Sequence, residues 1–186
     1  DPESGDFNFP FLKRYLQDIK VKVVNLAVRQ QGLIVAKGNP LDIKGIKDLA
    51  RPGLRFINRQ RGAGTRILLD HHLKMAGISS DQVSGYKQEE FTHMAVAVNV
   101  LNSAADCGMG IYAAAKALDL DFIPLARERY DLLIPEELLR DSKISVLLEL
   151  LRSERFQKAV EDLGGYETYL TGQIMEPGQA LGEKGD

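Results

Sequence analysis

The stretch that decides the fold reads NRQRGAGTR and occupies residues 58–66. It follows a short apolar run at residues 54–57, which predicts a buried strand, and it precedes residues 67–76, whose pattern predicts a helix that Gly77 ends. The order is therefore a strand, a glycine-containing loop and a helix. The first turn of a helix presents backbone N–H groups and the positive end of the helix dipole, so this order favours an anion at the loop.

The residue types within the loop support ligand binding. Gly62 and Gly64 let the backbone approach a ligand without a Cβ in the way. Thr65 is predicted to cap the helix, or to turn its hydroxyl toward the ligand. The same nine residues contain no acid and carry guanidinium groups suited to carboxylate, phosphate or another oxyanion, on Arg59, Arg61 and Arg66. The alternative is an ordinary glycine-bearing turn with solvated arginines.

The bulk composition fits an ordinary globular protein. Of the 186 residues 44% are hydrophobic and 27% charged, and the net charge of −2 gives no general attraction to nucleic acid or to a membrane. The longest apolar runs are shorter than the ~20 residues that a membrane helix needs. Cys107 is the one cysteine, which excludes an internal disulfide and is compatible with a reducing compartment. We therefore expect a cytoplasmic protein without a membrane partner.

The rest of the chain alternates predicted strands and helices. Two strand pieces at residues 21–28 and 33–37 are separated by polar residues 29–32, which we expect at a surface bulge or lining a cleft. A second interruption, a polar turn, is expected at residues 127–129. Further strands are predicted at residues 83–86, 106–110, 122–125 and 130–134, and helices at residues 11–16, 46–50, 93–102, 111–118, 142–151 and 154–163. The alternation predicts an α/β protein with mainly parallel sheets flanked by helices.

Ligands in such proteins bind where the strands end and the helices begin. Three further segments have this character: Thr92 with His93 at a helix start, the glycine-containing residues 108–112, and the polar residues 29–31. Thr92 is also the predicted cap of its helix. The complete set of predicted ligand-binding residues is Arg29, Gln31, Arg59, Arg61, Gly62, Gly64, Thr65, Arg66, Thr92, His93, Gly108 and Tyr112.

Metal binding and catalysis are the weaker interpretations. His71 and His72 are consecutive on a predicted helix and point to different faces, so we predict no metal site. Cys107 is interpreted as a packed thiol, because a nucleophilic role would need a base and only His93 is a candidate. We predict no cofactor and no catalytic residue.

Two groups of charged residues also receive simple interpretations. Glu89 and Glu90 precede a helix start, where acids are favourable to the helix dipole, and this explains them better than an acid/base pair. A cluster of basic residues is interpreted as a solvated face and comprises Arg127, Arg129 and Arg140.

Five motifs occur in a particular order. They read VRQQGLIV at residues 28–35 followed by GNP, IKDL at residues 46–49, NRQRGAGTR at residues 58–66, THMAVA at residues 92–97 and ADCGMG at residues 105–110. In this order they resemble the type II periplasmic-binding-protein fold, above all the substrate-binding domains related to LysR-type regulators. Such domains occur beside helix-turn-helix domains or fused to molybdopterin-biosynthesis proteins. The central loop is similar to the Gly-Ser-Gly-Thr loop of phosphate-binding relatives, but Ala63 replaces the serine, which argues against tight phosphate binding.

The resemblance implies two lobes joined by two crossing strands. Residues 1–44 and 126–172 would form lobe I, residues 45–125 lobe II, and residues 173–186 a loose tail. The family has a further strand and helix before the point where this chain starts, so lobe I would be incomplete at its N-terminus. A homodimer, or a partner segment, would then cover the exposed apolar surface. DNA would be bound only through a separate domain.

The implied function is the binding and sensing of a small ligand. The ligand would be an anion or a polar metabolite, for example an oxyanion such as molybdate or tungstate, and the domain would serve a regulator or a protein related to molybdopterin biosynthesis. Two alternatives stay open. One is a phospho-transfer enzyme on the same scaffold, which would want magnesium and acids such as Asp70 or Asp106. The other is a structural dimerisation module.

Overall fold

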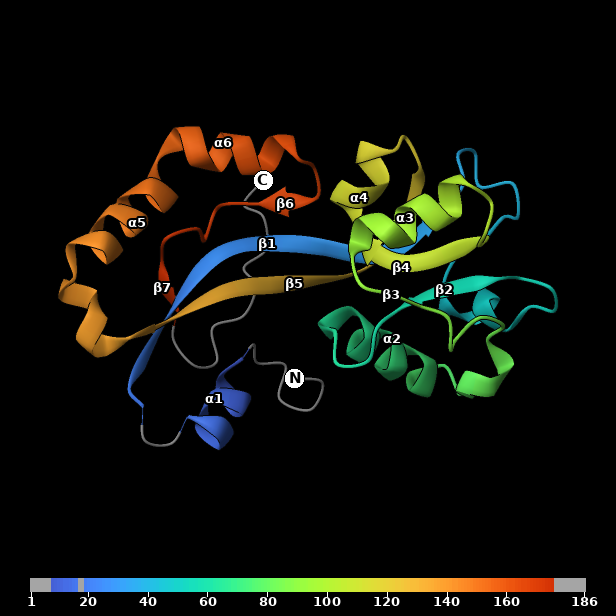
Figure 1. The fold of residues 1–186 in the computed structure, drawn as a ribbon, viewed down its shortest axis with the longest axis horizontal. Coiled ribbons are helices and arrows are strands. Elements are labelled where there is room, and N and C mark those ends of the chain that lie inside the picture. Colours follow the sequence, from blue (N-terminus) through green and yellow to red (C-terminus); the bar gives the residue numbers. More distant parts are fainter. Residues whose placement is uncertain (1–7, 17–18, 176–186) are drawn as a thin grey trace. The chain divides into compact units, whose positions relative to one another are not determined.

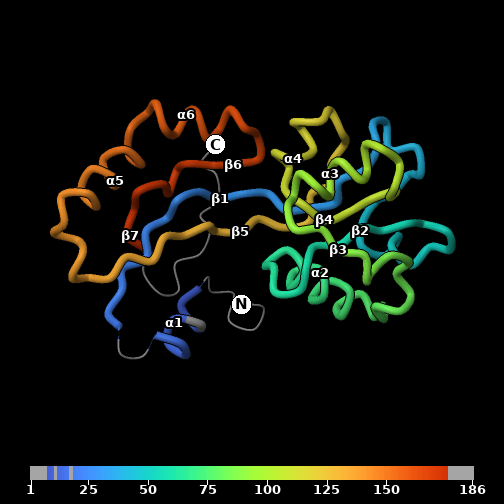
Figure 2. Tube along the Cα trace, viewed as in Figure 1, coloured from blue at the N-terminus to red at the C-terminus, as the bar shows by residue number. Residues whose placement is uncertain are grey.

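The computed structural model describes residues 8–16 and 19–175, and these divide into two compact units. Unit 1 comprises residues 1–29, 128–162 and 166–186, and unit 2 comprises residues 30–127 and 163–165. Two strands of fifteen residues, β1 (Val21–Val35) and β5 (Asp121–Pro135), pass through both units and can be followed in Figure 2. The lobe boundaries implied by the resemblance stay a prediction.

A sheet with the strand order β3-β2-β4-β1-β5 organises the fold. The short strand β2 (Phe56–Arg59) is parallel to both β3 (Glu89–Glu90) and β4 (Cys107–Ile111). β1 runs antiparallel to β4, and in unit 1 it also pairs antiparallel with β6 (Tyr166–Glu167) and β7 (Ile174–Met175). With helices on both faces of the parallel strands, the α/β prediction is confirmed.

In unit 2, each face of the sheet has its own core. The 3-10 helix η1 (Ile46–Ala50) and helix α2 (Gly64–Met75) cover one face, and α3 (His93–Leu101) and α4 (Tyr112–Ala117) cover the other (Figure 1). Alternate side chains of a strand point to opposite faces, so neighbouring residues join different cores. The core under α2 includes Leu33, Phe56, Leu69, Leu73 and Met109, and the core under α3 includes Ile34, Ile57, Val96, Ala97 and Ala115.

In unit 1, amphipathic helices cover the strands. The elements are α1 (Phe9–Tyr15), the 3-10 helix η3 (Glu136–Arg140), α5 (Ser142–Arg152) and α6 (Glu154–Asp162). The apolar face of α5 packs with Val24 of β1 and Ile134 of β5. This face contains Ile144, Leu147, Leu148 and Leu151. The predicted tail begins with β7, and its residues 176–186 lie outside the described part of the chain.

The predicted interruptions of β1 and β5 are wrong, because both strands are continuous. In the first of these segments, the polar side chain of Arg29 has partners in β5. Arg29 of β1 forms an ion pair with Glu128 of β5 and lies over the ring of Tyr130, with 4.7 Å from the guanidinium carbon to the ring centre. The backbone of Arg29 meanwhile stays in the sheet opposite Tyr166. A run of polar residues therefore does not end a strand when neighbouring strands supply counter-charges.

Two further local predictions are wrong. Residues 83–86 form no strand, since Gly85 has a φ of +91° and packs directly on the backbone of Phe56. The neighbouring strand is β3 instead. The N-cap of α2 is Ala63, and Thr65 already lies inside the helix. Within the described residues, no helix has the length and apolar character that crossing a membrane would require.

Candidate functional site

The loop between β2 and α2 is a tight turn that leads directly into the helix. The backbone N–H of Ala63 donates to the carbonyl of Gln60 at 3.2 Å, and Gly62 between them has a φ of +84°. This left-handed conformation at the third turn position favours glycine. Ala63 then adopts an extended conformation and α2 begins at Gly64. The first turn of α2 is thus placed at the carboxyl end of a parallel strand.

Two backbone N–H groups at this helix start are available to a ligand. The N–H groups of Arg66 and Ile67 both donate to the carbonyl of Ala63, at 2.9 and 3.1 Å. Among the described residues, by contrast, no acceptor receives the N–H of Gly64 or Thr65, and Ala63 offers no capping side chain. A Cβ built on Gly64 would meet nothing within 4 Å, so the approach is open. The arrangement offers two backbone donors at the positive end of a twelve-residue helix.

The side chain of Arg59 makes contacts inside the protein and is not an exposed cation. Its side chain is buried and donates to the carbonyls of Glu90 at 3.3 Å and Phe91 at 3.0 Å. Its Nη1 lies 3.0 Å from Nδ1 of His93. Because a guanidinium group can only donate, Nδ1 of His93 must accept in this contact. Arg59 therefore fixes the segment that leads into α3, on the face of the sheet opposite α2.

Arg66 is likewise buried inside the protein. Its guanidinium carbon lies 3.9 Å from the centre of the Tyr86 ring, and Nη1 donates to the carbonyl of Arg59 at 3.2 Å. Two carboxylates contact it, Asp70 at 3.3 Å and Glu89 at 3.4 Å. Neither acid was predicted as a partner of Arg66. The i, i+4 spacing of Arg66 and Asp70 indicates one of the two pairs, whereas Glu89 lies on β3, far from Arg66 in the sequence.

Arg61 is the exposed arginine of the loop. Its side chain is 86% exposed, and its Nε lies 3.8 Å from a Glu89 oxygen. The backbone N–H of Arg61 also points to Glu89, at 3.4 Å. Two acids thus offset much of the charge of the three arginines. Attraction for an anion at this loop rests chiefly on the backbone N–H groups, with Arg61 adding a screened charge.

The second predicted helix start is confirmed as a cap. The hydroxyl of Thr92 accepts from the backbone N–H of Ala95 at 2.9 Å, so it satisfies the first turn of α3. His93 lies on the same face of the sheet, next to Gly110, where an added Cβ would come within 3.6 Å of Nδ1. Gly108 lies under α3, and a Cβ there would come within 2.5 Å of Val96. The glycines of β4 thus allow α3 to pack closely.

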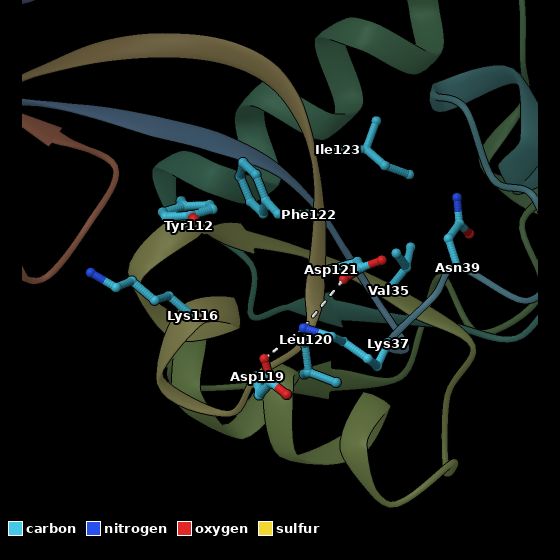
Figure 3. Close-up of a pocket in the computed structure, with 10 residues that line it drawn as sticks. All are labelled: Val35, Lys37, Asn39, Tyr112, Lys116, Asp119, Leu120, Asp121, Phe122 and Ile123. Atoms are coloured by element: carbon cyan, nitrogen blue, oxygen red, sulfur yellow. Dashed lines mark hydrogen bonds and ion pairs between the residues drawn. The ribbon is translucent and has the colours of Figure 1, made fainter.

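Tyr112 is placed at another cavity of unit 2. It opens α4 and stacks edge-on against Phe122, with ring centres 5.4 Å apart (Figure 3). Together with Lys37 and other residues it lines a cavity of about 420 Å³. Lys37 there is paired with Asp119 at 2.6 Å and Asp121 at 4.0 Å. Paired charges make this cavity less suited to an anion than the α2 loop.

Gln31 is the most unusual of the predicted ligand residues. It lies in β1 opposite Ile111 and is completely buried. Among the described residues, neither its amide oxygen nor its amide nitrogen has a hydrogen-bond partner. Arg29, two residues earlier, belongs to unit 1 and forms an ion pair with Glu128.

The residues considered for catalysis and metal binding have structural surroundings. Burial, and then the charge of Asp106, raise the pKa of the Cys107 thiol, which disfavours the thiolate that a nucleophile requires. A hydrogen bond from Arg55 lowers the pKa of the Asp106 carboxyl, and the two side chains approach to 2.6 Å. In the described parts of the chain, no three His, Cys, Asp or Glu residues are grouped in a way that could hold a metal ion.

The fold and the helix-start site define a class of binding proteins. Residues 1–152 match the family model of the PBP superfamily domain, so this chain belongs to the periplasmic-binding-protein superfamily. Among its relatives is the Bacillus subtilis protein YvgK, which is 39% identical over 175 residues. That match covers 94% of this chain and 56% of YvgK, so the chain spans about half the length of this relative.

Solved structures of low sequence identity share the fold. A Clostridium perfringens protein assigned to phosphate ABC transport, solved with bound phosphate, has a TM-score of 0.58 at 17% identity, covering 79% of this chain and 71% of that one. The substrate-binding domain of a Clostridium difficile protein assigned to molybdenum ABC transport has a TM-score of 0.58 at 16% identity, covering 85% of this chain and 71% of that one. The type II periplasmic-binding-protein fold is therefore confirmed.

Proposed function

We propose that this ligand-binding domain binds a small anion at the N-terminus of α2. One observation carries the proposal: the N–H groups of Gly64 and Thr65 have no acceptor among the described residues and face an open approach. The family supports it, as does the phosphate bound by a structural relative. Attachment to a regulator or to a molybdopterin-biosynthesis protein, a homodimer and a cytoplasmic location stay predictions.

The three arginines have different parts in this proposal. The guanidinium groups of Arg59 and Arg66 hold the segments on either side of the turn, so they act as positioning residues. Arg61 attracts an anion from solution, because its side chain is exposed. The ligand itself is held by the backbone donors of the helix start, whose orientation is fixed before binding and needs no further ordering.

Gly64 allows a direct test of the backbone donor. It is the first residue of α2, where proline is well tolerated, and the preceding Ala63 already has the extended conformation that proline requires of its neighbour. Gly64→Pro therefore removes one N–H while preserving the helix, and Gly64→Ala keeps the N–H and adds only a Cβ. The pair separates the donor from the shape of the loop.

The measurement is isothermal titration calorimetry of this chain with phosphate, sulfate, molybdate, tungstate and small carboxylates at fixed low salt. We expect at least one anion to bind, and Gly64→Pro to weaken it roughly 10- to 100-fold, since a hydrogen bond to a charged group is worth about 1.5–3 kcal/mol. Gly64→Ala should bind as the unchanged chain does. Equal affinities of the proline variant and the unchanged chain would show that the site lies elsewhere.

A further inference from the structure

The side-chain amide of Gln31 is a buried donor and acceptor without a partner. Its exposed fraction is 0%, and within residues 8–16 and 19–175 neither Oε1 nor Nε2 finds a hydrogen-bond partner. An amide buried in this way is unfavourable, because both groups were hydrogen-bonded to water in the unfolded chain. Such a group in a folded protein calls for an explanation, and a bound molecule that satisfies it is one.

The sheet register places Gln31 at the level of the α2 helix start. Ile57 of β2 lies opposite Gly108, and three residues further along these parallel strands Gln60 reaches the level of Ile111. Ile111 is also the partner of Gln31 in β1. Gln31 and the first residue of the loop are therefore two strands apart at one level, a distance of roughly 10 Å.

The side chain of Gln31 also points to the correct face of the sheet. Leu33 and Val35, two and four residues later in β1, belong to the core that includes Leu69 and Leu73 of α2. Side chains two residues apart in a strand share a face, so Gln31 projects toward the side of α2. A ligand held by the N–H groups of Gly64 and Thr65 would lie on this same side of the sheet, and it would reach the buried amide of Gln31 once the side chains around the amide move apart.

We infer that Gln31 contacts the bound anion and selects anions that carry a hydrogen-bond donor as well as acceptors. This inference rests on the proposed function. The class comprises protonated oxyanions, such as monohydrogen phosphate and arsenate, and hydroxy carboxylates. Fully deprotonated oxyanions, such as sulfate, molybdate and tungstate, belong to the disfavoured class.

The chemistry of the two partners explains the selection. The helix start offers only donors, which any anion satisfies. The amide offers the two N–H donors of Nε2 and the acceptor Oε1, and an anion without an O–H or N–H leaves Oε1 of Gln31 unpaired. A binding site discriminates strongly when the wrong ligand leaves one of its buried polar groups without a partner.

Matched pairs of probes test the selection. Phosphate and sulfate have nearly the same shape, as do lactate and propionate, and only the first member of each pair carries a donor near neutral pH. We expect the unchanged chain to bind the donor-bearing member at least about tenfold more tightly, the factor that one buried hydrogen bond supplies. Gln31→Met, which is similar in length but cannot hydrogen-bond as an amide does, should remove this preference. Gln30→Met should retain the preference, because residue 30 precedes Gln31 in the same strand and its side chain points to the opposite face of the sheet.

The stability of the ligand-free variants gives a second, independent readout. If the amide of Gln31 is unsatisfied without ligand, Gln31→Met should leave the melting temperature unchanged or raise it. A lower melting temperature would mean that the protein or a buried water already satisfies the amide, and the inference would be wrong.

The possible binding results separate this inference from the proposed function. If sulfate or molybdate binds as tightly as the donor-bearing probes and Gly64→Pro abolishes that binding, the proposed site stands and the role of Gln31 is refuted. If no probe binds, the proposed function fails and this inference fails with it. A preference that Gln31→Met leaves intact would also refute the inference.

Discussion

The arginines at positions 59, 61 and 66 stand in one loop, and burial gives them different roles. Arg59 and Arg66 have exposed fractions of 8% and 5%, and their donors meet carbonyls and carboxylates of the protein. The side chain of Arg61 is 86% exposed. All three are arginines of one nine-residue stretch, so their neighbours in the fold distinguish a structural arginine from a solvated one.

Replacing Arg59 should therefore cost more stability than replacing Arg61. Arg59→Lys keeps the charge but loses the planar fork that reaches the carbonyls of Glu90 and Phe91 together with His93. We expect a loss of about 1–3 kcal/mol in the free energy of unfolding. Arg61→Lys should change it by less than about 0.5 kcal/mol. Urea denaturation measures both, and equal losses would contradict the structural role of Arg59.

The thiol of Cys107 should react only when the protein unfolds. The side chain is fully buried, and burial raises its pKa, so the reactive thiolate is scarce and inaccessible. We expect labelling by a thiol-specific disulfide reagent to be slow in buffer and rapid in urea, with one thiol reacting per chain. Fast labelling of the folded protein would mean that Cys107 is open to solvent.

At the scale of the element, the starts of α2 and α3 differ in the residue at the N-cap position. α3 has a side-chain cap at Thr92, while α2 has Ala63 at its N-cap, whose side chain cannot accept from the first backbone donors of the helix. This difference separates a helix start that is complete in itself from one that can accept a ligand. The hydroxyl of Thr92 is engaged as this cap, and its part in ligand binding stays a prediction.

The cap of α3 can be tested by substitution. Thr92→Ala removes the hydroxyl that accepts from Ala95, and we expect it to lower the free energy of unfolding by about 1 kcal/mol. Thr92→Ser keeps the hydroxyl and should recover most of this loss. Thermal unfolding of the two variants makes the comparison. An alanine variant as stable as the serine variant would show that the cap contributes nothing.

α2 should make the stability of the protein depend on pH. Burial, and to a lesser degree the charge of His71, lower the pKa of His72 below its ordinary value of 6.5. The unfolded chain therefore binds a proton that the folded chain does not, and stability falls as the pH drops below about 6.5 toward the lower pKa of the folded state. Between pH 7.5 and 5.5 we expect the melting temperature of His72→Gln to fall less than that of the unchanged chain. The fall for His71→Gln should stay closer to that of the unchanged chain. Identical pH profiles for His72→Gln and the unchanged chain would contradict this account.

At the scale of the whole molecule, two long strands carry the chain through both units (Figure 2). In unit 1 they are linked by side chains as well as by the sheet. Asp131 of β5 accepts from Asn25 of β1 at 2.9 Å, from Asn8 at 2.8 Å and from Arg129 at 3.0 Å. The side chains of Arg129 and Asp131 are 0% and 1% exposed, so the prediction of a solvated basic face is wrong for Arg129.

Removing one partner of this buried pair should destabilise the protein strongly. Asp131→Ala removes the carboxylate that lies 3.0 Å from Nε of the buried Arg129, and we expect a loss of about 3–5 kcal/mol in the free energy of unfolding. The double variant Arg129→Met with Asp131→Leu should be more stable than the single one, because no charge then remains buried. Urea denaturation of both variants tests this, and a double variant less stable than the single one would argue against the charge effect.

The sequence by itself determined the α/β class, the strand–loop–helix order around residues 58–66 and the cap at Thr92. These depend on periodicity, on glycine and on contacts within a few residues, which are local in the chain. They also place the open helix start at the carboxyl end of a strand, which is the main part of the proposed site.

Only the tertiary structure decided which charged side chains have partners within the protein and which strands are continuous. Arg59 meets Phe91, Arg66 meets Glu89, and Arg29 meets Glu128, and no local pattern connects such distant residues. The burial of Gln31 likewise depends on the strands on either side of β1. The physical reason is that local sequence sets where a strand or helix begins and ends, whereas the partners of a buried polar group are set by the packing of segments far apart in the chain.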